Sequence, residues 1–346
     1  MKVSLLGYGL AGRVFHAPLI AATDGLELAT IVVGDETRAT QAREAFPEAL
    51  VTPESDAAWD ADVVVVATPN RFHVSYAHEA LARGVPAVID KPLGATQAEV
   101  EGLLADLDRI GGRLTVFQNR RWDGDFLTAR RLVAEHALGP VLRLTSRFVR
   151  YRPEIKDGWR EAGDPRDGGG QLLDLGSHLI DQALLLLGPA RRVYAEIDRA
   201  RPGARADDDV FLAVEHEAGA RSHLSMSAVA PVPAPRLELS GLRGGFRTEQ
   251  LDVQEAQLKL GLGPAAPSYG LNPPGQRFDA TGIHEEPVDR GAYPAFYEGV
   301  RAWVAGEAPA PVDPHDSRAV FAVMEAARRS AASGQVVPIE RTPGAH

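Results

Sequence analysis

The first twelve residues constrain the fold of this chain more than any other stretch. The apolar run "VSLLG" leads directly into "GYGLAG", which places glycines at positions 7, 9 and 12. A G-x-G-x-x-G spacing between a strand and a helix is typical of a dinucleotide-binding turn. The glycines allow a tight turn and close approach of a pyrophosphate, which the helix N-terminus then binds. A purely structural glycine turn is the alternative. We predict cofactor contacts from Gly7, Tyr8, Gly9, Leu10, Ala11 and Gly12.

The next hundred residues alternate short apolar runs with helical patterns. Strands are predicted at 3–7, 27–33, 62–68, 86–90 and 114–118, and helices near 36–45, 72–83 and 96–109. The valine run at 63–66 is apolar on both faces, as a strand buried in a parallel sheet must be. This β-α-β alternation predicts an α/β fold that begins with a Rossmann domain, a doubly wound parallel sheet, over residues 1–120.

After residue 120 the pattern changes to strands that follow one another without intervening helices. Strands are expected at 141–151, 191–199, 209–216, 220–229, 236–240 and 245–249, and helices near 125–137, 172–188, 293–305 and 315–333. Residues 261–277, rich in glycine and proline, are expected to form a long loop that could act as a lid. We predict an α+β domain over 121–346 with a large, open, mostly antiparallel sheet and a last helix that packs back toward the Rossmann domain.

Composition excludes several classes of partner. The net charge is −10, so we expect neither nucleic acid nor a membrane as a partner, because both require basic patches. Cysteine is absent, which excludes disulfides and thiolate metal sites and fits a cytoplasmic location. No secretory leader is expected, because "MKVSLLGYG" runs straight into the first strand.

The end of the second predicted strand should contact the adenosine ribose. An acidic side chain there suits the 2′-hydroxyl of NAD, whereas arginine suits the 2′-phosphate of NADP. The sequence offers Gly34, Asp35 and Arg38. Asp35 lies one place late for an NAD-binding carboxylate, and Arg38 could reach a phosphate. The choice between NAD and NADP therefore stays open at this point.

Two further turns follow predicted parallel strands and should face the same crevice. "TPNRFH" supplies Thr68, Pro69, Asn70 and His73, for which turn formation or helix capping is the alternative to cofactor contact. "VIDKPLG" supplies Asp90 and Lys91. Only four of the 37 basic residues are lysines, so a lysine here suggests a function that guanidinium cannot perform. An ammonium group is compact and can lose its proton when it is desolvated.

A second cluster lies in "GGGQLLDLGSHLID", where Asp174 and His178 are four residues apart. On a helix they would share one face, where the carboxylate could orient the imidazole or raise its pKa. Histidine is the natural acid–base group near neutral pH. A buried structural histidine and half of a metal site are the alternatives. No convincing third and fourth metal ligands accompany the pair, so we predict no metal site.

Five motifs in register resemble the Gfo/Idh/MocA oxidoreductases, which include glucose–fructose oxidoreductase and the inositol dehydrogenases. They are "GYGLAG", "TPNRFH", "DKP", "QNRRWD" and "GGGQLLDLGSH", and the resemblance spans essentially the whole chain. The stretches at 7–20, 119–126 and 269–277 look most like the scyllo-inositol dehydrogenase-like branch. The family more commonly has glutamate where this chain has Asp90.

The resemblance implies specific roles for these residues. Lys91 corresponds to the family lysine that lies beside the nicotinamide and binds the reacting oxygen. Asp174 and His178 correspond to the D-x-x-x-H pair, whose histidine moves the proton. Asn119 follows the last strand of the nucleotide domain, near the nicotinamide. The implied activity is hydride transfer between NAD(P) and a secondary alcohol or ketone of a sugar, inositol or related polyol.

Other expectations are less specific. Trp122, Arg150, Arg152 and Trp159 could line the substrate side of the crevice, or could be ordinary packing and salt bridges. Family members form dimers or tetramers, and an uncovered sheet face favours a homo-oligomer here. Two other functions stay open: an NAD-dependent glycosidase that transiently oxidises C3, and a non-catalytic nucleotide-binding sensor.

Overall fold

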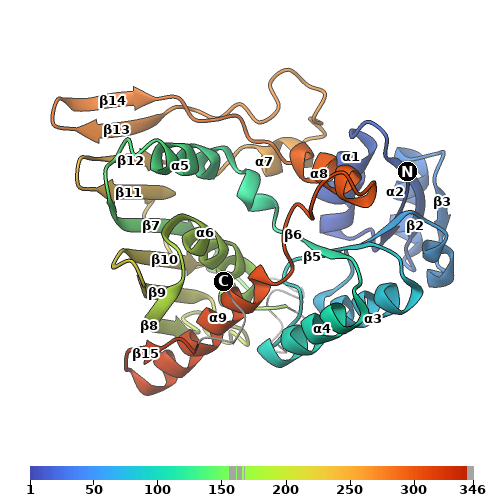
Figure 1. Cartoon of the computed structure of the whole chain (residues 1–346), viewed down its shortest axis with the longest axis horizontal. Coiled ribbons are helices and arrows are strands. Elements are labelled where there is room, and N and C mark those ends of the chain that lie inside the picture. Colours follow the sequence, from blue (N-terminus) through green and yellow to red (C-terminus); the bar gives the residue numbers. More distant parts are fainter. Residues whose placement is uncertain (156–160, 162–165, 167, 341–346) are drawn as a thin grey trace.

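A computed structural model describes all residues except 156–160, 162–165, 167 and 341–346. Two β-sheets organise the chain, a six-stranded one and a nine-stranded one (Figure 1). The strands are β1 Lys2–Leu6, β2 Glu27–Val32, β3 Leu50–Thr52, β4 Val63–Val66, β5 Ala87–Asp90, β6 Leu114–Phe117, β7 Val141–Val149, β8 Ala190–Asp198, β9 Asp209–His216, β10 Arg221–Ser227, β11 Leu237–Gly241, β12 Gly244–Thr248, β13 Gly275–Asp279, β14 Gly282–Glu286 and β15 Val337–Pro338. The helices are α1 Ala17–Ala21, α2 Glu36–Ala45, α3 His73–Arg83, α4 Gln97–Ile110, α5 Gly124–Ala134, α6 Ser177–Leu187, α7 Gln254–Lys259, α8 Pro294–Val304 and α9 Asp316–Ser333.

The six-stranded sheet has the Rossmann strand order β3-β2-β1-β4-β5-β6, and all its strand pairs are parallel. All four valines of β4 are fully buried, as their position in the middle of a sheet covered on both faces requires. The strand order reverses between β1 and β4. The carboxyl ends of the strands at such a switch point form the ligand crevice of open α/β sheets.

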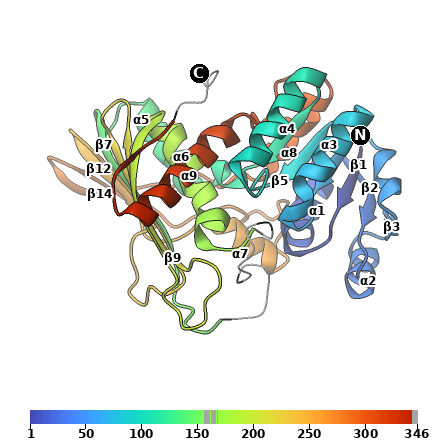
Figure 2. The same ribbon diagram turned by 90° about the horizontal axis from the view of Figure 1, so that it is seen from below.

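The nine-stranded sheet has the order β14-β13-β12-β11-β7-β10-β9-β8-β15. Its neighbours are antiparallel except for the parallel pair β7–β10. Helices α5, α6 and α9 lie on the side of this sheet that faces the Rossmann part, and the opposite side is open (Figure 2). The predicted combination of a Rossmann sheet with an open, mostly antiparallel sheet is therefore confirmed.

Two details of the sequence prediction were wrong. Residues 275–277 belong to β13, which forms an edge hairpin with β14; both strands are short and polar, so they lack the alternation that reveals a strand. The loop before β13 is held by hydrogen bonds to Gln257 and Arg290, and none of its residues lines the cleft at the end of the parallel strands. The short elements β3, α7 and β15 were also not predicted. Within the described residues, no helix is long and apolar enough to cross a membrane.

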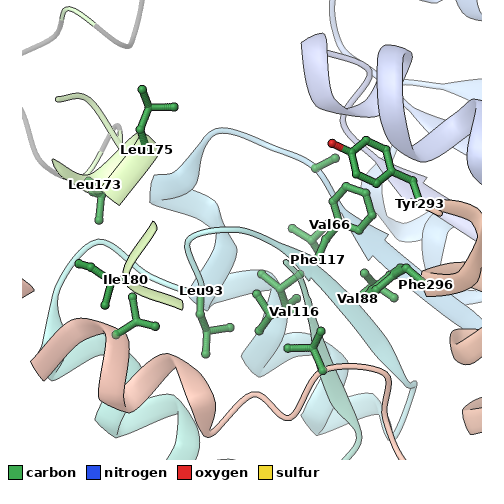
Figure 3. Packing of buried hydrophobic residues seen from close by; sticks show 14 of the residues in the cluster. Val66, Val88, Leu93, Val116, Phe117, Leu173, Leu175, Ile180, Tyr293 and Phe296 are labelled. Carbon is green, nitrogen blue, oxygen red and sulfur yellow. The ribbon is translucent and has the colours of Figure 1, made fainter. Parts of the chain in front are cut away.

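An aromatic cluster joins the two parts at the end of β6. Phe117 is almost fully buried, and its ring lies 4.9 Å from that of Phe296 and 4.3 Å from that of His16. Figure 3 shows Phe117 between Val66 of the Rossmann sheet and Phe296 of α8. The His16 imidazole also bonds the Tyr297 hydroxyl at 2.6 Å. These contacts fix α8, which lies late in the chain, against the helical turn that follows the glycine motif.

Helix α9 contacts the part of the chain that forms the six-stranded sheet. Arg318 of α9 donates to Glu101 of α4 at 2.8 Å. Arg121, which follows β6, forms a bidentate pair with Asp181 of α6 and reaches Asp316 at the start of α9. The geometry between the two sheets is thus set by ion pairs as well as by the aromatic cluster.

We predict that Phe117→Ala lowers the free energy of unfolding by about 3–5 kcal/mol, because it removes the side chain on which both parts pack. Urea denaturation of the nucleotide-free protein measures this. The matched control is Phe72→Ala, whose ring is 45% exposed and which should change stability by about 0.5 kcal/mol or less. Equal losses in the two variants would contradict the assigned role of the cluster.

Candidate active site

A cleft of about 620 Å³ opens at the carboxyl ends of the parallel strands and continues to helix α6. It brings together most of the residues predicted from the sequence. Those that line it are Gly7, Tyr8, Gly9, Leu10, Ala11, Gly34, Asp35, Arg38, Thr68, Pro69, Asn70, His73, Asp90, Lys91, Asn119, Arg150, Asp174 and His178. Residues from the first glycine turn and from position 178 therefore share one cavity.

The three glycines of the turn have different physical roles. Gly7 has φ +101°, and a Cβ there would lie 2.5 Å from the Ala67 carbonyl oxygen. A Cβ at Gly12 would lie 2.1 Å from the Gly7 carbonyl oxygen, so Gly12 closes the turn rather than lining the cleft. Gly9 lines the cleft and has no atom within 4 Å of the Cβ position. Gly9 thus leaves an open surface of backbone for a ligand.

Two polar side chains in the cleft fit a bound dinucleotide. The Thr68 hydroxyl and both polar atoms of the Asn70 amide are buried and have no hydrogen-bond partner among the described residues. Buried polar groups in native proteins are nearly always paired, so unpaired ones that line a cavity indicate a missing ligand. Thr68 lies directly beside the glycine turn, since its backbone nitrogen is 3.0 Å from the Cβ position of Gly7.

The cleft has an extension at the end of β2, where the sequence left the cofactor undecided. The Asp35 carboxylate caps α2 by accepting from the Arg38 backbone N–H at 2.9 Å. Arg13, Thr37 and Arg38 line an adjoining cavity of about 430 Å³ together with Tyr8 and other residues of the turn. Two guanidinium groups, a hydroxyl and the Asp35 carboxylate therefore line the place where an adenosine 2′-substituent would lie, and the Arg38 guanidinium is 4.0 Å from that carboxylate.

An ion pair connects the turn after β5 to the helical segment after residue 171. Lys91 Nζ donates to the Asp174 carboxylate at 2.8 Å and to the Asp174 backbone oxygen at 2.7 Å. Both side chains are mostly buried, with exposures of 15% and 11%. The wider π-helical turn Leu172–Gly176 precedes α6 and carries Asp174. Such turns are frequent at functional sites because they re-aim side chains on a helix.

His178 is buried in the first turn of α6 and lines the cleft. Its Nδ1 lies 3.1 Å from Gln118 Oε1, and the Gln118 amide nitrogen donates to the Ser177 oxygen. This amide orientation requires Nδ1 to carry the proton, so Nε2 is the basic nitrogen. Nε2 has no hydrogen-bond partner among the described residues. The imidazole is therefore oriented by Gln118 rather than by Asp174, which corrects the sequence interpretation.

The pKa of His178 is lowered well below its ordinary value, not raised as the neighbouring carboxylate had suggested. Burial is the main cause, and the positive charges of Lys91, Arg120 and Arg236 add to it. The Asp174 carboxylate pairs with Lys91 instead. His178 is consequently neutral near pH 7 and able to accept a proton.

Asp90 and His73 hold the loop that carries Lys91. The Asp90 carboxylate accepts from the Lys91 backbone N–H at 2.8 Å. Burial opposes ionisation of Asp90, but His16, His73 and Lys91 lower its pKa overall. Both His73 ring nitrogens contact backbone oxygens, those of Thr68 and Pro92. His73 thus ties two strand-end turns together, which is the structural alternative recognised in the sequence.

Sequence reasoning missed Gln118, Arg120 and Glu255. Arg120 lines the cleft, stacks on Phe148, and pairs with Asp123 and Glu255. Burial alone would raise the pKa of Glu255, but Arg120 and Lys259 lower it to about 2. Gln118 and Arg120 lie within the quoted "QNRRWD" motif, which was the available signal. Glu255 is in α7, a helix too short to be recognised.

Three predicted residues do not line the cleft. Gly12 packs inside the turn, Trp122 packs its ring against Phe296 at 5.5 Å, and Arg152 is exposed at the surface. Trp159 lies outside the described residues. The described residues contain no group of three or more side chains suited to a metal ion.

Comparison with known proteins decides the family. Residues 1–118 match the model of the oxidoreductase family with an NAD-binding Rossmann fold, and residues 126–247 match the GFO/IDH/MocA C-terminal domain. This chain belongs to the Gfo/Idh/MocA family. As a member of that family it is an NAD(P)-dependent dehydrogenase or reductase.

Two curated members of the Gfo/Idh/MocA family span nearly the whole chain. Oxidoreductase YdgJ of Escherichia coli K12 is 36% identical over 96% of both chains. The NADP-dependent scyllo-inositol 2-dehydrogenase IolW of Bacillus subtilis 168 is 31% identical over 98% of this chain and 96% of its own. The crystal structure of an oxidoreductase from Klebsiella pneumoniae superposes with a TM-score of 0.90 at 34% identity, covering 99% of this chain and 96% of its own.

The glycine turn yields a paired prediction. Gly9→Ala should fold with nearly unchanged stability, because the added methyl group meets open space, but should weaken NADPH binding by about tenfold or more, roughly 1.4 kcal/mol. Gly12→Ala should instead lower stability by about 1–3 kcal/mol or more, because the methyl group strikes backbone. Thermal unfolding and NADPH fluorescence titration separate the two. Unchanged binding in Gly9→Ala would refute nucleotide contact at this turn.

Proposed function

We propose that this protein transfers hydride between NADP and a secondary alcohol or ketone of a sugar, inositol or related polyol. One observation carries the proposal. The cleft beside the glycine turn is also lined by Lys91, from the turn after β5, and by Asp174 and His178, from the helical segment after residue 171. Thr68 and Asn70, whose side chains carry the unpaired polar atoms, line the same cleft. The resemblance to the NADP-dependent scyllo-inositol dehydrogenase supports the polyol class.

The proposed proton path uses His178. During oxidation its unprotonated Nε2 accepts the hydroxyl proton of the substrate, and during reduction it returns that proton to the oxygen. Gln118 keeps Nδ1 protonated and so keeps Nε2 as the accepting atom. The low pKa of His178 means that the base form predominates at neutral pH. The nicotinamide, when bound, supplies the hydride-accepting and hydride-donating carbon.

Lys91 is proposed to bind the reacting oxygen. Its ammonium group donates to two Asp174 oxygens and has a third hydrogen available. A donor aimed at this oxygen stabilises the negative charge that develops when the proton leaves. Asp174 then acts as a positioning residue for Lys91. This assignment differs from the simple view in which Asp174 orients the histidine.

NADP is the proposed cofactor rather than NAD. Arg13 and Arg38 lie on the cavity beside the end of β2, and Asp35 is engaged in capping α2. Guanidinium groups bind phosphate by bidentate, charge-assisted hydrogen bonds. A free carboxylate aimed at the ribose 2′-hydroxyl, the usual determinant for NAD, would have favoured the opposite choice.

A homodimer or homotetramer through the nine-stranded sheet is also proposed. None of the helices in the described part of the chain covers its outer side (Figure 2), and a second subunit commonly covers such a face. The division into a cofactor domain over residues 1–120 and a substrate and oligomerisation domain over 121–346 accompanies this proposal. A cytoplasmic location stays a prediction from composition.

The function is tested by measuring NADP-dependent turnover of a sugar and polyol panel by the wild type and by Lys91→Ala. We expect Lys91→Ala to lose nearly all turnover, because the donor to the reacting oxygen is gone, while NADPH affinity stays within several-fold. Lys91→Arg should also be impaired, since a planar guanidinium cannot place its charge as an ammonium does. Full activity of Lys91→Ala would refute the assignment.

The same assay separates the other enzyme class. A glycosidase that oxidises and then reduces its substrate releases an aglycone from a nitrophenyl glycoside without net NADPH formation. Aglycone release without absorbance change at the nicotinamide band would replace the proposed reaction. Net NADPH formation from a free sugar or polyol supports it. Tight nucleotide binding with neither reaction would favour a sensor.

The cofactor choice gives a separate prediction. Arg38→Ala should weaken NADPH binding by about tenfold or more, the range expected for losing a hydrogen bond to a charged group. NADH binding should change less than about twofold, because NADH has no 2′-phosphate. Tryptophan fluorescence quenching measures both constants on one sample. Equal weakening of the two nucleotides would indicate that Arg38 does not bind the phosphate.

A further inference from the structure

The substrate side of the cleft contains one arginine that the proposed chemistry does not use. Arg150 directly follows β7 and lines the cleft. Its backbone is fixed on both sides, since its N–H donates to the Ser227 oxygen and its carbonyl accepts from Ala230. Every second residue of β7 is buried, including Ser146 and Phe148. Because side chains alternate between the two faces of a strand, Arg150 lies on the same side of the sheet as these two, the side that the helices cover.

The other cations that the described residues place at this end of the cleft are paired. Lys91 is paired with Asp174. Arg120 is paired with Asp123 and with Glu255, and Glu255 also accepts from Lys259. The half-buried Arg150 guanidinium has no hydrogen bond or ion pair within the part of the chain that the structure describes. A partly desolvated cation without a partner is unfavourable in the free protein, so a ligand anion at this point would relieve that cost.

The surroundings of Arg150 locate it at the substrate end rather than the nucleotide end. Burial is the main cause that lowers the pKa of Arg150, followed by repulsion from Arg152, while Glu255 and Asp174 act in the opposite direction. Asp174 is the residue bonded to Lys91, so Arg150 faces the neighbourhood of the proposed reacting atoms. The guanidinium groups assigned to the nucleotide, Arg13 and Arg38, lie in the cavity beside β2.

We propose that the substrate carries a carboxylate, which Arg150 binds, so that the preferred substrates are sugar acids rather than neutral polyols. This inference rests on the proposed function and narrows its substrate class. The reaction is ordinary alcohol oxidation: the C–H hydrogen leaves as hydride to NADP⁺, the O–H proton goes to His178, and a ketone and NADPH form. The carboxylate takes no part in the chemistry and orients the substrate.

A single negative charge fits better than a phosphate ester. Arg150 supplies one unpaired positive charge, and the adjacent Glu255 and Asp174 carboxylates would repel a dianion. Glu255 is ionised, with a pKa of about 2, because Arg120 and Lys259 overcome its burial. Its oxygens suit donation from sugar hydroxyls. The cleft thus offers a cation for the acid group and an acceptor for hydroxyls.

The test compares substrates that differ only at C6. D-glucuronate and D-glucose form one pair, D-galacturonate and D-galactose a second, and glucose 6-phosphate tests the dianion. Calorimetry measures their binding to the wild-type protein saturated with NADPH, which requires no turnover, and NADP⁺ reduction measures kcat/KM. We expect each acid to bind about ten- to a hundredfold more tightly than its neutral partner.

Arg150→Gln should remove this preference while leaving NADPH affinity unchanged. The matched control is Arg143→Gln, which removes the same charge from an exposed position on β7 and should keep the preference. The inference is overturned if neutral sugars or the phosphate ester bind as well as the acids, or if Arg150→Gln retains the preference. Acid binding that depends on Arg150 without any hydride transfer would support the inference and contradict the proposed function.

Discussion

The ion pair between Lys91 and Asp174 is the contact on which the candidate site depends. It joins the turn after the fifth parallel strand to the helical segment that precedes α6, 83 residues later. A pair this buried gains little net stability, because desolvation offsets most of its attraction, but a buried charge without its partner is strongly unfavourable. Its main consequence is geometric, since it fixes an ammonium group next to the imidazole of His178. The aromatic cluster around Phe117 and the Arg121 ion pairs hold the two sheets at the separation that this contact requires.

The polar side chains around the cleft fall into two groups. Some have hydrogen-bond partners within the protein and hold the site in place, and others have none and line the cavity. His73, Gln118 and Asp90 are engaged with backbone or with neighbouring side chains, so they hold the turns and the imidazole in place. Thr68, Asn70 and the Arg150 guanidinium are unpaired among the described residues and line the cavity. Polar groups that are unpaired in the free protein can form hydrogen bonds when a ligand binds. The positions of these groups therefore indicate where the polar atoms of the ligand would lie.

The sequence predicted the Rossmann sheet almost strand for strand because its signals are local. Valine runs mark buried parallel strands, and the glycine spacing marks the turn through a steric requirement that Gly7 and Gly12 meet in the structure. Features that depend on contacts between distant parts of the chain were not predicted. The hairpin Gly275–Glu286 is polar and depends on pairing with β12, and the role of Asp174 depends on a π-helical turn that no periodicity reveals. Gln118, Arg120 and Glu255 act through contacts with residues 60 to 135 positions away, which a single sequence does not display.

The chain as a whole is negatively charged, whereas several of the side chains that line the cleft are positively charged. The charges in the cleft matter more for binding. The net charge of −10 would repel an anionic cofactor and an anionic substrate at long range. At physiological ionic strength, however, exposed charges are screened beyond about 8 Å, so groups that line the cavity dominate. Arg13 and Arg38 line the cavity beside the end of β2, and Arg150 and the Asp174-paired Lys91 line the main cleft. The cations that line the cleft, rather than the net charge of the chain, therefore decide which anions it can bind.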